Sequence, residues 1–265
     1  MTSGLLGIVA GSGSLPGLVA RGHRAAGGRC FVLALAGAAD ASALDVAPDA
    51  MIGVGEPMRG FDILRAAGVS DVILVGGVKR PSLGDIKMDP RAAAFLARVA
   101  LRALGDDSLL RAVGHEIERE GFRLVGLKQA APELMAPRGP IGKLDAPGPM
   151  RLHISIGLQA ARDLGRDDRG QAVVVADGIV VDRESNSGTD ALIARAAHAG
   201  AVLVKCRKPQ QDERFDLPAI GPATVAACAR AGFAGIAVER GETVIIDRAA
   251  VAAAADQAGL FVVGV

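Results

Sequence analysis

The sequence predicts an α/β protein built from two domains with a cleft between them. Three observations support this fold class. Short apolar runs of strand length alternate with segments of helical spacing in both halves of the chain, which is typical of parallel sheets with crossover helices. A stretch rich in proline and glycine separates the two halves. Half of the 265 residues are apolar, so one or two domains can each bury a core.

The first half begins with alternating strands and helices. Strands are expected over residues 5–10, 29–36, 51–54 and 71–75, with helices over 15–26 and 57–67 between them. Two consecutive helices follow, over 90–104 and 106–120, and Asp89 is the expected N-cap of the first, with Pro90 at its first position. This alternation predicts a parallel sheet.

Residues 130–149 differ from both halves because prolines stand at positions 132, 137, 140, 147 and 149, among several glycines. Such a composition favours an extended linker or an ordered crossover loop. We therefore predict a first domain over 1–131, a linker over 132–149 and a second domain over 150–265.

The second half again alternates. Helices are expected over residues 150–164, 190–199, 224–231 and 248–258, and extended segments over 172–181, 201–205 and 260–265. Two more strands, 234–238 and 243–246, flank a turn at Arg240-Gly241. The second half is therefore a second α/β unit.

Composition excludes several kinds of protein. A formal net charge of +1, no Trp and no Tyr argue against nucleic acid as a partner. Cys30, Cys206 and Cys228 are an odd number without a CxxC pair, so neither a disulfide framework nor a zinc site is expected. The four histidines are scattered without metal-ligand spacing and are expected to pack or face solvent.

The first apolar run has no basic residues before it and is soon broken by Gly, Ser and Pro16, unlike a signal peptide. No apolar stretch reaches the ~18 residues of a membrane span. We expect a cytoplasmic protein that can still touch a membrane surface.

The run Gly11-Ser12-Gly13-Ser14-Leu15-Pro16 follows the first strand and opens the first helix. Glycines let backbone N–H groups approach a phosphate, and a helix N-terminus favours an anion. The run departs from the dinucleotide pattern, because Pro16 replaces its third glycine and no acidic residue closes the second strand. A phosphate or nucleotide loop, a tight structural turn and a nicotinamide site all remain open.

Three further motifs each have a second interpretation. Gly76-Gly77-Val78-Lys79-Arg80-Pro81 follows a strand at the sheet edge where ligands bind, and is otherwise a solvated pair of cations. Gly105-Asp106-Asp107 offers a helix cap, or a carboxylate for a ribose or a metal-bound water. Asn186-Ser187-Gly188-Thr189-Asp190 offers a cap, or a second anion site with Asp190 facing a metal.

The polar segment 208–218 lies between an apolar strand and an Ala-rich helix. It is longer than most such connections, it mixes both signs of charge, and Pro209 and Pro218 stiffen it. Charged loops at strand ends commonly carry chemistry in α/β proteins. Taken alone, the segment is equally well interpreted as a solvated loop.

Together these motifs resemble the LpxI family, the UDP-2,3-diacylglucosamine pyrophosphatases of lipid A biosynthesis. The resemblance covers essentially the whole chain. Its elements occur in order: Gly11-Ser12-Gly13 with Leu15-Pro16, Val78-Lys79-Arg80-Pro81, Gly105-Asp106-Asp107 with Leu109-Leu110-Arg111, Arg138-Gly139 with Gly142-Lys143, Gly188-Thr189-Asp190, and Lys208-Pro209-Gln210 with Asp216-Leu217-Pro218 and Ile220-Gly221-Pro222.

The resemblance implies a Rossmann-like nucleotide-binding domain followed by a catalytic and lipid-binding domain. It also implies Mg²⁺-dependent hydrolysis of UDP-2,3-diacylglucosamine to UMP and 2,3-diacylglucosamine 1-phosphate. The essential Asp of the family falls on Asp216, which we expect to bind Mg²⁺ or to orient the attacking water.

We expect Lys208 and Asp190 to be catalytic as well, with Lys208 and Arg80 neutralising charge on the diphosphate. The expected substrate-binding residues are Gly11, Gly13, Ser14, Leu15, Pro16, Arg80, Asp107, Gly188, Thr189 and Gln210. Asp212 and Glu213 are left as surface residues. The expected partners are the lipid-linked UDP-sugar, the cytoplasmic surface of the inner membrane in transient contact, and a second copy in a homodimer.

Two other classes of function stay open from the residues. The N-terminal half alone could belong to an NAD(P)-dependent oxidoreductase, although Pro16 and the missing ribose carboxylate count against it. A non-catalytic nucleotide sensor is the other alternative, because the sequence identifies no general base.

Overall fold

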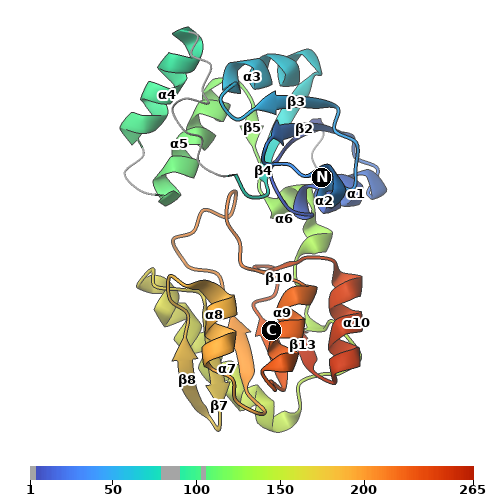
Figure 1. The fold of residues 1–265 in the computed structure, drawn as a ribbon, viewed down its shortest axis with the longest axis vertical. Helices are drawn as coiled ribbons and strands as arrows, with labels where there is room; N and C mark the ends of the chain where they lie inside the picture. Colours follow the sequence, from blue (N-terminus) through green and yellow to red (C-terminus); the bar gives the residue numbers. More distant parts are fainter. Residues whose placement is uncertain (1–3, 79–89, 103–105) are drawn as a thin grey trace. The chain divides into compact units, whose positions relative to one another are not determined.

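The computed structural model of the protein describes residues 4–78, 90–102 and 106–265 (Figure 1). Contacts between residues divide the chain into two compact units. Unit 1 comprises Met1–Glu133 with Asp212–Phe215, and unit 2 comprises Leu134–Gln211 with Asp216–Val265. Our division with a separate linker over 132–149 stays a prediction, while the contacts assign most of that range to unit 2. The predicted cleft between the domains also stays a prediction.

Unit 1 alternates strands and helices, as predicted. Its elements are β1 (Leu5–Ala10), α1 (Leu15–Ala25), β2 (Cys30–Ala36), α2 (Ala41–Leu44), β3 (Ala50–Gly53), α3 (Pro57–Ala66), β4 (Val69–Val75), α4 (Pro90–Arg102), α5 (Asp106–Arg119), β5 (Arg123–Leu124) and α6 (Leu127–Ala130), followed by the 3₁₀ turn η2 (Pro132–Leu134). The short elements α2, β5, α6 and η2 carry too few residues to show a period in the sequence.

The strands of unit 1 form one five-stranded sheet in the order β3-β2-β1-β4-β5, and every neighbouring pair is parallel. This is the strand order of doubly wound nucleotide-binding sheets. The order reverses between β1 and β4, and ligands of such sheets bind beyond the carboxyl ends of the strands at that point. The loops after β1 and β4, at Gly11 and Gly76, therefore lie at the expected binding edge.

Unit 2 contains β6 (Gly139–Pro140), α7 (Gly148–Arg166), β7 (Ala172–Ala176), β8 (Ile179–Arg183), α8 (Gly188–Arg195), β9 (Val202–Lys205), β10 (Ala219–Ile220), α9 (Pro222–Arg230), β11 (Gly235–Val238), β12 (Val244–Ile245), α10 (Arg248–Ala258) and β13 (Phe261–Gly264). Six strands form a sheet in the order β6-β13-β11-β9-β7-β8, whose centre β13-β11-β9 is parallel. A two-stranded sheet pairs β10 with β12.

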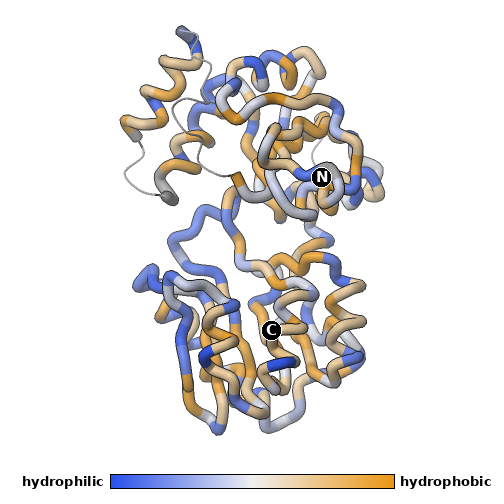
Figure 2. Tube along the Cα trace, in the orientation of Figure 1, coloured by the Kyte–Doolittle hydropathy of each residue, from blue (hydrophilic) through white to orange (hydrophobic). Residues whose placement is uncertain are grey.

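The inner strands of the unit 2 sheet are covered on both faces, which explains why β7, β11 and β13 are apolar throughout (Figure 2). Val202 and Val204 of β9 pack with Ile154 and Leu164 of α7. Leu203, which points to the opposite face, packs with residues of α8, α9 and α10. The predicted α/β class is thus confirmed in both units.

The predicted long extended segment 172–181 is wrong, because the chain forms a hairpin of β7 and β8. Asp177 and Gly178 make the turn with φ values of 50° and 77°. An Asp-Gly pair between apolar runs is a strong hairpin signal, since both residues tolerate positive φ. The strands 234–238 and 243–246 are present, but they lie in different sheets, as β11 and β12.

Two other expectations concern the cysteines and the membrane. Cys30, Cys206 and Cys228 are free thiols. Burial raises the pKa of Cys206 and of Cys228 to about 12. Of the helices that the structure describes, none combines the length and the apolar character that crossing a bilayer requires.

Candidate active site

The loop that follows β9 ends at Asp216, whose carboxylate is exposed. Gln211 is 8% exposed and donates a hydrogen bond from Nε2 to Oδ2 of Asp216 at 2.6 Å. Its Oε1 accepts a hydrogen bond from the backbone N–H of Lys208 at 3.1 Å. One buried amide therefore orients the Asp216 carboxylate, while Oδ1 accepts no hydrogen bond from the described residues.

The side chains of Lys208 and Gln210 attach the same loop to the end of α7. Lys208 Nζ lies 3.0 Å from Oδ1 of Asp168, and its hydrogen bond and charge lower the pKa of that carboxyl. Gln210 donates from Nε2 to the carbonyl oxygen of Gly165 at 2.7 Å. Both side chains thus have partners within unit 2, and their roles toward a substrate stay predictions.

A buried polar cluster lies beside Asp216. Lys205, the last residue of β9, is 6% exposed and donates to Thr189 Oγ1 at 3.2 Å and to the carbonyl of Ala219 at 3.1 Å. Thr189 donates in turn to Oε1 of buried Glu184 at 2.5 Å. Burial lowers the pKa of Lys205, and the nearby carboxylates of Glu184, Asp216 and Asp190 oppose this shift.

The start of α8 brings Asp190 to the same cluster. Gly188 opens the helix with a φ of 82°. Ser187 is the N-cap, but its side chain makes no capping hydrogen bond and contacts Ser185 and Arg195 instead. Capping therefore does not account for this motif. Asp190 is exposed in the first turn and accepts no hydrogen bond from the described residues.

The donor set suits a cation such as Mg²⁺, which prefers oxygen ligands and keeps several waters. Asp216 and Asp190 are exposed carboxylates that both act on Lys205 electrostatically. Within the described ranges, no group of three or more His, Cys, Asp or Glu side chains forms a metal cluster. Two carboxylates are enough for Mg²⁺ but not for a dehydrated structural metal.

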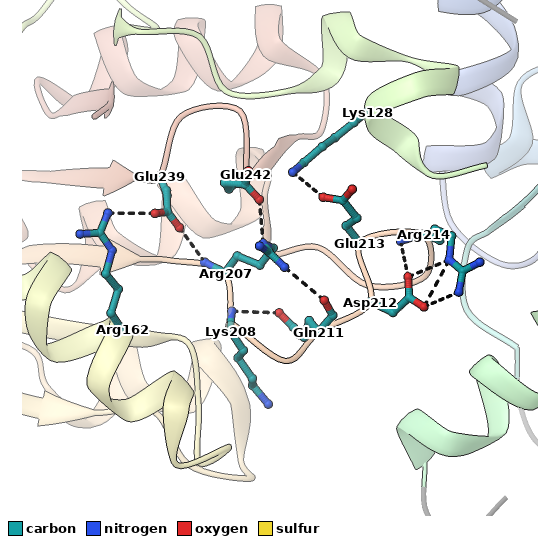
Figure 3. A network of polar contacts seen from close by, with 10 residues as sticks. All are labelled: Lys128, Arg162, Arg207, Lys208, Gln211, Asp212, Glu213, Arg214, Glu239 and Glu242. Atoms are coloured by element: carbon teal, nitrogen blue, oxygen red, sulfur yellow. Dashed lines mark hydrogen bonds and ion pairs between the residues drawn. The ribbon is translucent and has the colours of Figure 1, made fainter. Parts of the chain in front are cut away.

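The base of the loop is held by a polar network in unit 2 (Figure 3). Arg207 forms an ion pair from Nε to Oε2 of Glu242 at 2.7 Å, and its backbone N–H donates to Oε2 of Glu239 at 3.2 Å. Glu239 also accepts from Arg162 Nη2 at 2.9 Å. Arg207 Nη1 donates to the carbonyl of Gln211 at 3.1 Å, so the network reaches the residue that orients Asp216.

Asp212 to Phe215 belong with unit 1, and Figure 3 shows the ion pairs of Asp212 with Arg214 and of Glu213 with Lys128. Asp212 binds Arg214 at 2.7 Å, which lowers the pKa of Asp212. Glu213 binds Lys128 at 2.7 Å. Phe215 packs against the apolar core of unit 1. The expectation that Asp212 and Glu213 are plain surface residues is therefore incomplete, because each forms an ion pair. The partner of Asp212 is two positions away in the sequence, whereas the partner of Glu213 is 85 positions away.

In unit 1 the glycines after β1 and β4 bring two loops into contact. The Ser12 N–H donates to the Gly77 carbonyl at 2.8 Å, and the Ser12 hydroxyl donates to the same oxygen at 3.0 Å. A Cβ on Gly11 would lie 2.5 Å from that carbonyl. A Cβ on Gly76, whose φ is 93°, would lie 2.5 Å from the Ser12 carbonyl. These glycines are required by the loop contact itself.

Of the other predicted site residues of unit 1, those at the start of α1 are described by the structure, whereas Arg80 and the side chain of Asp107 are not. Gly13 is exposed, has a φ of 88° and would meet no atom with an added Cβ. Ser14 is the N-cap of α1 without a side-chain capping bond, and Leu15 and Pro16 form the first turn. Arg80, Lys79 and Asp89 lie outside the described residues. Asp107 lies on α5, and its side chain is also outside them.

Comparison with known proteins identifies the family. The family model for the LpxI N-terminal domain matches residues 5–134, and the model for the LpxI C-terminal domain matches residues 137–263. A curated protein of Caulobacter vibrioides, "UDP-2,3-diacylglucosamine pyrophosphatase LpxI", is 43% identical over 274 residues, which cover 98% of this chain and 97% of that protein. The chain belongs to the LpxI family.

The two LpxI domain models meet near the point at which the contacts divide unit 1 from unit 2. In this LpxI chain, the predicted residues Asp216, Asp190 and Thr189 gather around one lysine. Sequence reasoning missed Lys205, Glu184 and Gln211 as members of the site. The available signal was Lys205, a charged residue that directly continues the apolar run Ala201-Val202-Leu203-Val204.

Proposed function

We propose that the protein hydrolyses the pyrophosphate bond of UDP-2,3-diacylglucosamine and releases UMP and 2,3-diacylglucosamine 1-phosphate. The observation that carries this proposal is the 43% identity, over 98% of the chain, to the pyrophosphatase of Caulobacter vibrioides. The exposed and oriented carboxylate of Asp216 supports it, because hydrolysis needs a group that positions a water or a cation at the diphosphate.

In this proposal the residues of unit 2 act on the reacting phosphates. Asp216 orients the attacking water or holds Mg²⁺, and Asp190 is the second carboxylate. Bound Mg²⁺ would neutralise charge on the diphosphate oxygens. Lys208 would turn from Asp168 toward the substrate, since their pair is partly exposed and costs little to break. Backbone N–H groups of Gly13 and Ser14 at the start of α1 would receive an anionic group of the nucleotide.

A cavity of about 570 Å³ in unit 2 is the best candidate to hold the acyl chains. Its apolar lining includes Ile154, Leu158 and Val263. Its charged lining consists of Arg138, Arg151, Arg240 and Asp145, so cations outnumber the one carboxylate. This mixture suits an amphiphile with an anionic group. We further propose that the protein meets such a substrate at the cytoplasmic surface of the inner membrane. Co-sedimentation with anionic vesicles tests the contact, and light scattering tests the homodimer.

The decisive experiment measures UMP release from UDP-2,3-diacylglucosamine in mixed micelles, with Mg²⁺ and with EDTA. The wild-type protein should release UMP only with the metal. Asp216→Ala should keep the thermal transition of the wild type and lose about 10²- to 10³-fold in turnover. Asp163→Ala is the matched control, because it removes an exposed carboxylate of α7 whose surface pair contributes little.

Each other outcome rejects a defined part of the proposal. If the folded wild-type protein binds UDP but releases no UMP, the chain is a sensor and not a hydrolase. If UMP release is equal with EDTA, the Mg²⁺ assignment is wrong. If Asp216→Ala turns over like Asp163→Ala, the catalytic assignment of Asp216 is wrong.

A further inference from the structure

Lys205 is an unusual residue in unit 2 because it is a lysine in the interior. Only 6% of it is exposed, and the strand that it ends is otherwise apolar. Lysines are almost never this buried unless they are paired. In the described parts of the chain no carboxylate lies within ion-pair distance of Nζ, whose hydrogen bonds go to the neutral acceptors Thr189 Oγ1 and Ala219 O.

These two hydrogen bonds join segments that are distant in the sequence. Thr189 lies in the first turn of α8, directly before Asp190. Ala219 begins β10, three residues after Asp216. One ammonium group therefore bridges the two segments that carry the candidate catalytic carboxylates.

Thr189, one of the two residues that Lys205 bridges, is also held by Glu184. The Thr189 hydroxyl donates a hydrogen bond to Oε1 of Glu184. Oε2 of Glu184 accepts a hydrogen bond from the backbone N–H of Gln171 at 2.7 Å. Glu184 is itself buried at 8% exposure. The cluster is thus attached by hydrogen bonds to the residues that directly precede β7 and directly follow β8.

Stability does not explain this lysine. Burial lowers its pKa despite three nearby carboxylates, so the charged form is less favourable in the folded protein than in the unfolded chain. Removing one member of a buried ion pair is strongly destabilising, but the hydrogen bonds of Lys205 Nζ go to neutral acceptors. Buried Glu184 keeps its hydrogen bonds from Thr189 and from the backbone N–H of Gln171 when the ammonium is removed. A costly buried charge next to an active site instead indicates a role in function.

We propose that Lys205 is a positioning residue of the active site, which holds Asp190 and Asp216 at a fixed separation by bridging Thr189 and Ala219. The proposal rests on the proposed hydrolase function. It assigns Lys205 no contact with the substrate. Its effect is on the geometry of the two carboxylates, and small displacements of catalytic groups have large effects on rate.

Lys205→Met tests the role, because methionine fills a similar space without the ammonium, while Thr189 keeps its bond to Glu184. We expect kcat for UMP release to fall about 100-fold and KM to stay within threefold. The thermal transition should stay equal to that of the wild type or rise. A merely structural lysine would lower kcat and thermal stability together.

Val238→Ala is the matched control. Val238 is fully buried on β11 and pairs in register with Lys205, so the change opens a cavity at the same depth and leaves the ammonium in place. We expect a lower thermal transition with kcat within threefold of the wild type at 25 °C. A kcat loss like that of Lys205→Met in this control would overturn the positioning role.

A double-mutant cycle tests the path through Thr189. If the bridge acts as one unit, Lys205→Met combined with Thr189→Val should lower kcat no further than the worse single change. Losses that simply multiply, or a Lys205→Met kcat within threefold of the wild type, reject the proposal. A folded wild-type protein without any UMP release rejects the hydrolase function instead.

Discussion

Gln211 and Asp216 are joined by a 2.6 Å hydrogen bond from the amide Nε2 to the carboxylate Oδ2. The same amide accepts the backbone N–H of Lys208, so one buried side chain connects the beginning and the end of the loop. A hydrogen bond to a charged acceptor contributes about 1.5–3 kcal/mol. This contact is therefore strong enough to select one orientation of the Asp216 carboxylate before substrate binds.

Gln211→Leu should lower kcat for UMP release about 10- to 100-fold, because Asp216 remains but loses its orientation. KM should change little. Steady-state kinetics with and without Mg²⁺ measures both.

Gln159→Leu is the control for this prediction. Gln159 also donates from Nε2 to an aspartate, Asp163 at 3.1 Å, but on the exposed surface of α7. It should turn over like the wild type. Equal kcat values for the two variants would show that orientation by Gln211 is unimportant.

The elements that the sequence predicted well are those with a strong period. The predicted bounds of the strand Leu5–Ala10 and of the helix Arg248–Ala258 equal the observed bounds. In both cases the apolar or Ala-rich pattern stops where the element stops. The hairpin at Asp177 was also predictable, since Asp-Gly between apolar runs is a turn signal.

Other features depend on contacts that a sequence does not contain. Nothing near Glu213 indicates that its partner is Lys128, 85 positions away. The two-residue strand β10 exists because β12 pairs with it. Gln211 is a polar residue in a polar loop, and only the folded chain shows that it is buried against Asp216. Long-range pairing of this kind leaves no local period to detect.

Asp190→Asn should reduce kcat at saturating Mg²⁺ and raise the Mg²⁺ concentration needed for half-maximal rate. Asn keeps the shape of the side chain and one oxygen ligand but removes the charge. We expect at least a tenfold effect on the Mg²⁺ requirement, which a titration of UMP release against free Mg²⁺ measures. If the Mg²⁺ curve is unchanged while kcat falls, Asp190 acts on the substrate and not on the cation.

Gly76→Ala should destabilise unit 1 more than Gly13→Ala. Both glycines have positive φ, so a side chain costs about 1–2 kcal/mol at either position. Only at Gly76 would the Cβ also meet a backbone atom, the Ser12 carbonyl at 2.5 Å. This overlap adds about 1–3 kcal/mol. Urea unfolding of the two variants checks the order, and equal midpoints would mean that the loop contact relaxes freely.

The buried thiols of Cys206 and Cys228 predict how stability depends on alkaline pH. Burial raises the pKa of each from 9.0 to about 12, so between these values the unfolded chain releases protons that the folded protein retains. The stability contributed by the protonated thiols is complete below pH 9 and is lost as pH rises toward 12. By linkage, each thiol lowers the free energy of unfolding by about 1.4 kcal/mol per pH unit in this range.

The chain has no Tyr, so no phenol titrates over the same interval. Urea midpoints at pH 8, 9.5 and 10.5 should therefore fall more steeply for the wild type than for the Cys206→Ala/Cys228→Ala variant, even though the cavities make that variant less stable at pH 8. Parallel pH dependences in the two proteins would show that these thiols ionise as readily in the folded state as in the unfolded chain.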